Sequence, residues 1–357
     1  MKNKSINTKC PTCGAPITFS PTSKKWECEY CENKYTLEEL QKYNNASNEK
    51  HNTTEDEYNN YSTYLCKECG AEIIADEHTT ATFCLYCGNT AILKNKLSGE
   101  FRPKKIIPFS IEKDCTISAF KNLSKRFPLM PKEFNNEKNI EKITGVYIPF
   151  WLYNVLVSGG IDAKGTKITS WSRGNTRYTK TDIYQLIRDG SMNFEKIPVD
   201  GSSKFDNSIM NSIEPFNYQE LIDYNHAYLS GFLAEKYDVD SESADDIAIE
   251  RALNSAKNQM LDDMGSYSTK TIVSNSLKSD EATSEYVLLP VWMVNVKYKN
   301  EYYIFAMNGQ TGKFIGNIPL DKNKAIRYFI FIFLGVFALV ILISYLIYLG
   351  GNLWKKY

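Results

Sequence analysis

The chain has 357 residues, and its 42 basic and 42 acidic side chains give a formal net charge of zero. That length is too great for one compact core and fits two or three domains joined by linkers. The charge balance excludes the class of strongly basic proteins that bind nucleic acid along their whole length.

Eight of the nine cysteines form four Cys-x-x-Cys pairs near the N-terminus. In chain order the pairs are Cys10 and Cys13, Cys28 and Cys31, Cys66 and Cys69, and Cys84 and Cys87. The first two pairs are separated by 14 residues, the last two are separated by 14 as well, and the two units repeat after 56. Such equal spacing indicates an internal duplication and is typical of metal sites rather than of a disulfide framework.

The oxidation state of these cysteines depends on the compartment. Residues 1–9 are polar and lack the apolar core of a secretory signal peptide. We therefore expect a reducing compartment and metal-binding thiolates, with a disulfide framework as the alternative.

Each unit offers four cysteine ligands and leaves no position open for water or substrate. The pattern predicts two structural Zn²⁺ ions, one on each set of four cysteines. Iron in a rubredoxin-like site is the alternative that spacing alone leaves open, and we favour zinc because structural Cys₄ sites are its usual niche. Because so few residues separate the pairs, we expect metal binding to stabilise each unit.

The chain as a whole is predicted to be multidomain. We expect two small zinc-ribbon domains built from β-hairpin knuckles, then an α+β domain with a weak internal duplication, then one transmembrane helix. The expected boundaries are 9–40 for the first ribbon, 41–63 for a flexible polar linker, 64–95 for the second ribbon, 101–320 for the α+β domain, 326–350 for the transmembrane helix and 351–357 for a short tail.

Within the α+β domain the sequence predicts both strands and helices. Alternating or β-branched runs favour strands at 105–111, 145–156, 182–187, 285–296 and 302–306, and helical periodicity favours helices at 111–127 and 243–264. The weak duplication is a shared Pro-x-Trp-x-x-Asn-Val pattern. We expect Pro149 and Pro290 at strand starts or sheet edges, and Trp151 and Trp292 as paired core residues rather than a ligand site.

Residues 328–349 form an uncharged apolar run. As a helix this run would be about 33 Å long, which is enough to cross a bilayer core of about 30 Å. Its basic flanks differ little in number, so they barely decide its orientation. The missing signal peptide and the need for reduced thiolates favour a single-pass protein of the cell membrane with its N-terminal bulk in the cytoplasm.

No catalytic constellation is evident in the sequence. His226 is the one histidine of the main domain, Cys115 has no evident partner, and the turn at 308–313 lacks the spacing of a phosphate-binding loop. We therefore expect no enzyme activity and no small-molecule substrate. Acidic residues balance or outnumber basic ones around both ribbons, so a protein partner is favoured over nucleic acid.

The layout resembles a bacterial family, common in Firmicutes, of transcription factor IIB-type zinc ribbon-containing membrane proteins. The resemblance rests on stretches spread over nearly the full chain: 66–70, 80–84, 97–103, 145–151, 195–200, 212–215 and 305–313. It implies zinc binding and a membrane location but no reaction, and the helicase label that some members carry would need nucleotide-binding motifs that are absent here. One departure is Glu32, which stands where the second ribbon has Gly88; it affects a turn and not the ligand set.

Together these features predict a membrane-anchored, cytoplasm-facing zinc protein that acts as an adaptor or sensor by binding another protein. The alternative is a nucleic-acid-associated factor of the replication or transcription type that is held at the membrane. A hydrolytic or redox enzyme is the third hypothesis.

Overall fold

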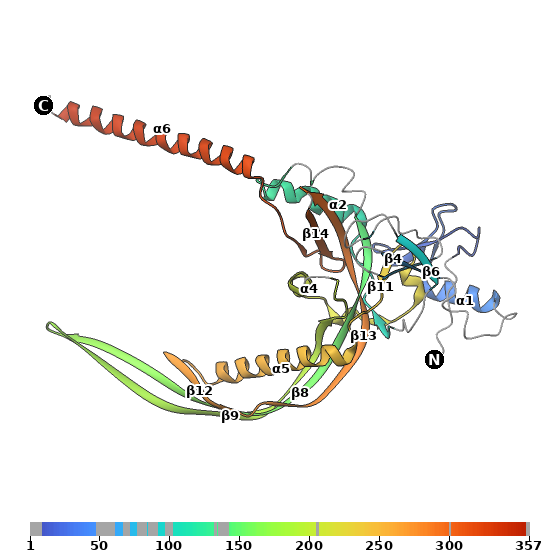
Figure 1. Cartoon of the computed structure of the whole chain (residues 1–357), viewed down its shortest axis with the longest axis horizontal. Coiled ribbons are helices and arrows are strands. Elements are labelled where there is room, and N and C mark those ends of the chain that lie inside the picture. The colour runs from blue at the N-terminus through green and yellow to red at the C-terminus, as the bar shows by residue number, and fades with distance from the viewer. Residues whose placement is uncertain are drawn as a thin grey trace.

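The computed structural model describes residues 9–47, 61–66, 72–76, 84, 92–96, 103–131, 134, 143–204, 207–299 and 301–354. In these residues the chain forms a cysteine unit near the N-terminus, a large domain that is mostly sheet, and one long C-terminal helix (Figure 1). The cysteine unit and the C-terminal helix lie at opposite ends of an elongated molecule.

The N-terminal cysteine unit, residues 9–47, contains a three-stranded antiparallel sheet followed by a helix. Its elements are β1 (Thr18–Ser20), β2 (Lys25–Glu27), β3 (Lys34–Tyr35) and α1 (Leu37–Ser47). Thr36 and Glu39 form a reciprocal capping box at the start of α1, with each side chain accepting the other residue's backbone N–H at 3.3 and 2.8 Å. This helix continues through residues 41–47, which the sequence had placed in the linker.

The N-terminal cysteine unit packs directly on the sheet domain. Trp26 is buried, and its indole N–H donates to the carbonyl of Ala227 at 2.8 Å. The rings of Phe19, Trp26 and Tyr228 lie 5.0–5.1 Å apart, and Tyr228 belongs to the short helix η4 (His226–Leu229) of the sheet domain. The unit and the domain therefore share one hydrophobic core.

The main sheet has twelve strands, and β8 and β13 run antiparallel through its centre. The path of paired neighbours is β10-β7-β13-β8-β11-β5-β4-β6, with β9 and β12 joined to β8, β14 joined to β13, and β15 joined to β14. The strands are β4 (Tyr61–Cys66), β5 (Glu72–Asp76), β6 (Ile92–Lys96), β7 (Lys105–Ile106), β8 (Thr144–Arg173), β9 (Thr176–Asp200), β10 (Ile222–Asp223), β11 (Leu233–Glu235), β12 (Thr269–Asn275), β13 (Lys278–Tyr298), β14 (Glu301–Asn308) and β15 (Phe314–Gly316).

Strands β4, β5 and β6 come from the region of the second set of cysteines, and they continue the main sheet. Strand β5 pairs antiparallel with β11, where Ile74 lies opposite Ala234 and Ile73 opposite Glu235. Both isoleucines are buried in the core of the sheet domain. This region is therefore attached to the main domain by backbone hydrogen bonds as well as by side-chain packing.

The remaining helices cover the sheet or leave it. They are α2 (Lys113–Arg126), α4 (Asn207–Ile213), η3 (Tyr218–Glu220), α5 (Ser241–Asp263) and α6 (Lys322–Trp354). Helix α5 is capped by Asp240, whose carboxylate accepts the N–H of Ser243 at 2.8 Å. Its buried stripe is small, which lets the helix lie close against β8 and β9; the stripe comprises Ala244, Ala248, Ala252 and Ala256, followed by Met260.

Strands β8 and β9 extend far beyond the sheet as a curved hairpin, with α5 along the concave side of its nearer half (Figure 1). The chain reverses at Gly174, whose φ of 61° suits a two-residue hairpin turn. From the sequence we expected only residues 182–187 of β9 as a strand. The distal half has no buried face, so its residues lack the apolar alternation by which strands are recognised.

The expectation that Pro149 and Pro290 lie at strand starts or sheet edges is wrong. Both lie within central strands, Pro149 in β8 and Pro290 in β13. On one side, β8 pairs with β11 before Pro149 and with β9 after it, and β13 pairs with β7 before Pro290 and with β14 after it. The carbonyl of Pro149 accepts the N–H of Gly201 at 3.0 Å, and that of Pro290 accepts the N–H of Gly309 at 2.9 Å. Proline is tolerated there because the ladder is interrupted on that side of the strand.

Trp151 and Trp292 also occupy matching surroundings. The indole N–H of Trp151 donates to the carbonyl of Val239 at 2.9 Å, immediately before the N-cap of α5. The indole N–H of Trp292 donates to the carbonyl of Ile111, also at 2.9 Å and immediately before the N-cap of α2. Both tryptophans are thus packing residues that join a central strand to the start of a helix.

Beyond its first turn, where Lys324 donates to the carbonyl of Met130, helix α6 has no packing partner among the described residues. An 18-residue stretch within Lys322–Ile347 has a mean hydropathy of 3.0, and the apolar side chains of the segment are exposed. Of the helices that the structure describes, α6 alone is long and apolar enough to cross a membrane. This agrees with the apolar run that the sequence places at 326–350.

Candidate metal centre

The first four cysteines converge on one point of the N-terminal cysteine unit. The sulfur atoms of Cys10, Cys13, Cys28 and Cys31 all lie within 4.8 Å of one another. Two sulfur pairs, Cys10 with Cys31 and Cys13 with Cys28, are 3.5 Å apart, much longer than a disulfide bond of about 2.05 Å. A tetrahedral ion with bonds of about 2.3 Å would separate its sulfur ligands by about 3.8 Å. The four cysteines could therefore hold a metal ion.

Each of the first two Cys-x-x-Cys pairs is followed by a residue in a left-handed backbone conformation. Gly14 has a φ of 74° and Glu32 a φ of 59°. The N–H of Gly14 donates to the carbonyl of Cys10, and the N–H of Glu32 donates to the carbonyl of Cys28, each at 2.9 Å. Two equivalent turns thus present the four sulfur atoms, although only one of them has the glycine that favours this conformation.

Tyr35 and Thr12 support the cysteines from one side. The Tyr35 hydroxyl lies 3.3 Å from the Cys10 sulfur and 2.6 Å from the Thr12 hydroxyl, which also accepts the Asn33 amide at 3.1 Å. Burial alone would raise the pKa of the Cys10 thiol, but the Tyr35 hydroxyl and the backbone N–H groups of Cys13 and Thr12 lower that pKa to about 6.

The pKa values of the Cys13 and Cys31 thiols are raised above the ordinary value. The backbone of Ala15 acts to lower the pKa of Cys13, but burial and the neighbouring sulfur atoms raise it to about 12. Four thiolates this close together repel one another, and a divalent cation among them would remove that repulsion. Cys10 and Cys28 are buried whereas Cys13 is exposed, so the cluster lies at the surface of the unit.

The second set of cysteines is described at two of its four positions. Cys66, the last residue of β4, and Cys84 are both buried, in a hydrophobic cluster that includes Tyr64. Cys69 and Cys87 lie outside the described residues. The ligand set expected for a second ion therefore stays a prediction.

The other residues weighed in the sequence lie apart from the cysteine cluster. Burial lowers the pKa of His226 to about 4, and its Nδ1 atom is 2.9 Å from the Tyr224 hydroxyl, so the imidazole is neutral at physiological pH. Cys115 is exposed in the first turn of α2. The buried Asn308 accepts the N–H of Thr311 at 2.9 Å and so closes the tight turn between β14 and β15.

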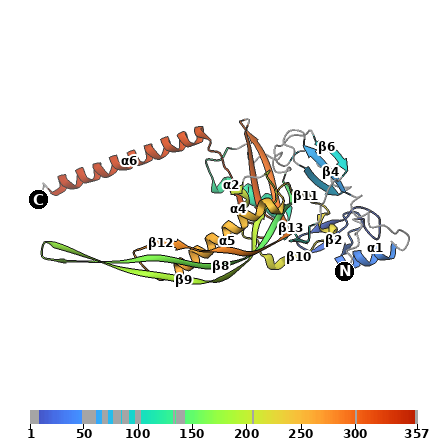
Figure 2. The same cartoon turned by 60° about the horizontal axis from the view of Figure 1, so that its bottom comes forward.

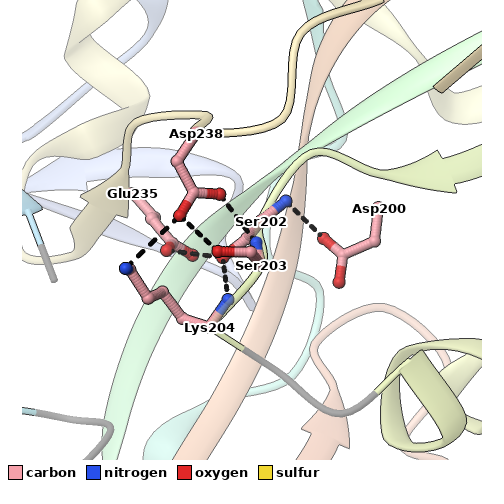
Figure 3. A network of polar contacts seen from close by, with 6 residues as sticks. All are labelled: Asp200, Ser202, Ser203, Lys204, Glu235 and Asp238. Atoms are coloured by element: carbon pink, nitrogen blue, oxygen red, sulfur yellow. Dashed lines mark hydrogen bonds and ion pairs between the residues drawn. The ribbon is translucent and has the colours of Figure 1, made fainter. Parts of the chain in front are cut away.

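A polar network that sequence reasoning missed lies at the end of β9 (Figure 3). The Ser202 hydroxyl donates to the buried carboxylate of Glu235 at 2.7 Å, and Asp238 accepts both the N–H and the hydroxyl of Ser203. Lys204 pairs with Asp238 at 3.4 Å. These contacts fasten the loop after β9 to the segment after β11. The dipeptide Asp-Gly at 200–201 is typical of a turn, but the sequence carries no signal of which residues that turn contacts.

Asp200 is the most perturbed carboxyl of this network. Burial raises its pKa to about 7, although its Oδ1 accepts the N–H of Ser202 at 3.0 Å, which acts in the opposite direction. Asn308 makes the equivalent contact at the end of β14, where its Oδ1 accepts the N–H of Gln310 at 2.9 Å. The matching position thus carries an uncharged amide, which indicates that the site favours a neutral side chain.

The chain resembles one Bacillus subtilis protein over almost its whole length. The two are 35% identical over 347 residues, which is 97% of this chain and 99% of the relative, a protein described as uncharacterized and named YdjG. No family model matches the chain, and no solved structure matches it significantly.

Proposed function

We propose that the chain, which belongs to the same family as YdjG of Bacillus subtilis, is a zinc-ribbon protein, anchored in the membrane by α6, that binds another protein on the cytoplasmic side. The observation that carries the proposal is the convergence of four cysteine sulfur atoms at one end of a molecule whose other end is an unpartnered apolar helix. The resemblance to the transcription factor IIB-type zinc-ribbon membrane proteins supports the same function.

Zinc is favoured as the metal by the ligand set. All four ligands are cysteines held by two turns of equal geometry, so a tetrahedral ion bound by them has no coordination position left for a substrate. A closed Cys₄ site is structural, so the ion stabilises the N-terminal cysteine unit and takes part in no reaction. We propose a second zinc ion on Cys66, Cys69, Cys84 and Cys87, and iron is the alternative at both sites.

The proposed orientation keeps both sets of cysteines in a reducing compartment. Helix α6 spans the membrane, the short tail after it is translocated, and the sheet domain stays in the cytoplasm. Translocating a few residues is far easier than translocating a folded domain of this size.

A protein partner is favoured by the exposed surface of the second cysteine turn. Tyr30, between Cys28 and Cys31, has 80% of its side chain exposed, and its neighbours Glu29 and Glu32 are acidic. An exposed tyrosine is typical of protein interfaces, whereas two carboxylates repel nucleic acid phosphates. A nucleic-acid-associated factor held at the membrane stays the alternative.

Chemical cross-linking in intact membranes tests the proposed function. Wild-type chain should give cross-linked protein species that are lost with Tyr30→Ser, a change that leaves the four cysteines in place. Glu38→Gln on α1 is the matched control and should keep the same species. If Tyr30→Ser keeps every cross-linked species while nucleic acid copurifies with the chain, the nucleic-acid alternative replaces the adaptor.

The matching contacts of the two prolines and the two tryptophans support a further proposal, that the sheet domain consists of two related halves. In one half β8 and β9 form the hairpin, and in the other β13 and β14 do so. The hairpin of β13 and β14 ends soon after its strands leave the sheet, whereas the hairpin of β8 and β9 continues far beyond the sheet. The fold therefore does not require the extension of β8 and β9, which points to a function of its own for that segment.

A further inference from the structure

The distal hairpin, residues 164–187 of β8 and β9, is basic. We refer to this segment as the arm. It carries five basic residues and one acidic residue, which are Lys164, Lys167, Arg173, Arg177 and Lys180 against Asp182. Asp182 is paired with Lys180 at 3.0 Å. The arm thus has a net charge of about +4 in a chain whose total charge is zero.

Aromatic side chains lie among these charges near the tip of the arm. Trp171 lies opposite Tyr178 in the strand register, and their rings stack at 5.7 Å with an interplanar angle of 12°. Trp171 is 49% exposed and Tyr178 is 44% exposed, so this ring pair covers no core. Tryptophan and tyrosine with exposed faces beside basic residues are favoured at the boundary between a bilayer and water.

The strand register places the ring pair on the same face of the hairpin that α5 covers nearer the sheet. Paired residues share a face, and every second pair lies on the same face. Ala163 and Leu186 are paired and buried in a cluster with Met260 of α5, which fixes their face as the α5 side. The pair Trp171 and Tyr178 lies on that same side, beyond the end of the helix.

The opposite face of the arm carries three exposed isoleucines among polar residues. Ile168, Ile183 and Ile187 lie on the face opposite the ring pair, and each has more than half of its side chain exposed. These isoleucines are separated by threonine, glutamine and lysine, so neither face of the arm is apolar enough to form a core of its own.

The arm and α6 leave the sheet domain on the same side, away from the N-terminal cysteine unit, in both views (Figures 1 and 2). If α6 spans a membrane, that side of the molecule faces the bilayer. The arm cannot enter the hydrocarbon, since its strands have open edges and its side chains are largely polar. In both views the arm reaches about as far in that direction as α6 does (Figures 1 and 2), so it can lie along anionic lipid headgroups where α6 crosses the bilayer at a tilt.

We propose that the arm binds the anionic lipid headgroups of the membrane that α6 crosses. Arg173, on the same face as the ring pair, and Arg177, beside the hairpin turn, attract the headgroups, and the rings of Trp171 and Tyr178 enter the interfacial layer. The inference rests on the proposed membrane span, because α6 is what directs the arm toward lipid rather than toward nucleic acid. A second attachment of this kind would fix the rotation of the sheet domain about α6.

Tryptophan quenching by brominated lipid tests the proposal with the full chain in nanodiscs. The signal of Trp171 is the difference between wild-type chain and Trp171→Phe. In discs that contain phosphatidylglycerol that difference should be quenched about twofold more strongly than in discs of phosphatidylcholine alone. Trp354, at the end of α6, is present in both chains, so its quenching in Trp171→Phe reports separately whether α6 is inserted.

Charge variants complete the test. Arg173→Gln with Arg177→Gln should abolish the extra quenching, whereas Lys125→Gln with Arg126→Gln on α2 removes the same charge and should keep it. Equal quenching of Trp171 in both lipids while Trp354 is quenched would overturn the lipid proposal and leave the span intact. Binding of a labelled oligonucleotide that requires Arg173 and Arg177 and weakens with salt would assign the arm to nucleic acid instead.

Discussion

Glu32 adopts the same left-handed backbone conformation as Gly14 at the equivalent position of the two cysteine turns. Both residues donate their N–H to the carbonyl of the first cysteine of the pair at 2.9 Å. Only glycine adopts this conformation without a steric cost, which for other residues is about 1 kcal/mol. The second turn is therefore strained, and the four sulfur atoms are held in place despite that strain.

Replacing Glu32 by glycine should strengthen metal binding. We expect Glu32→Gly to stabilise the metal-loaded N-terminal cysteine unit by about 0.5–1 kcal/mol, because the strain disappears while the N–H contact to Cys28 is kept. Competition with a chromogenic chelator measures the change. Gly14→Ala is the reciprocal control: no atom lies within 4 Å of the added Cβ, so backbone strain alone should weaken binding by a similar amount. Equal affinity in all three chains would contradict the role assigned to the turn.

The pH dependence of stability should contain a contribution from Asp200. Its pKa is raised from 3.8 to about 7, so the folded state binds a proton that the unfolded state has lost. That contribution to stability is present below pH 4 and is lost as the pH rises toward 7. Asp200→Asn keeps the Oδ1 acceptor for Ser202 and removes the charge. We expect this variant to be more stable than wild type at pH 8, by about 1–3 kcal/mol.

Thermal unfolding of both chains in detergent at pH 5 and pH 8 measures the effect of Asp200→Asn. The difference in stability between the two chains should grow with pH. The cysteine thiols titrate in both chains, so their contribution cancels in that difference. A variant less stable than wild type at pH 8 would show that the carboxylate is ionised and paired in the fold.

Trp26 should hold the N-terminal cysteine unit on the sheet domain without contributing to metal binding. Trp26→Phe removes the hydrogen bond to Ala227 and part of a buried ring, at a cost of about 1–3 kcal/mol. We expect the variant to keep its metal and to become more sensitive to proteases between the unit and the domain. Limited proteolysis followed by metal analysis of the fragments checks both expectations, and metal loss from the intact variant would contradict this division of roles.

The N-terminal cysteines and α6 could be predicted from the sequence because both depend on local patterns. Four cysteines at metal-ligand spacing converge whatever the rest of the chain does, and a long apolar run forms a helix on its own. The pairing of β5 with β11 could not be predicted, since Ile74 and Ala234 are far apart in sequence and carry no pairing signal. The position of Pro149 was predicted wrongly, because proline is tolerated in a central strand only where the hydrogen-bond ladder is interrupted. That interruption arises only in the assembled sheet.

The orientation of α6 can be tested by thiol labelling of intact cells with a membrane-impermeant reagent. We expect a cysteine at Asn352 to be labelled and one at Gln259, on the exposed side of α5, to be protected. Cys115→Ser serves as the background, because Cys115 is the exposed native thiol outside the cysteine clusters. Labelling at Gln259 would place the sheet domain outside the cell, where disulfides rather than metal would be expected.

The central claim is that the cysteines of the N-terminal region bind zinc as closed Cys₄ sites. X-ray absorption at the zinc edge, on the full chain purified in detergent under reducing conditions, measures metal identity and ligand set together. We expect two zinc ions per chain, each with four sulfur neighbours at about 2.3 Å and no oxygen or nitrogen ligand. Iron in place of zinc, light-atom ligands, or a folded chain whose cysteines are reduced and bind no metal would contradict it.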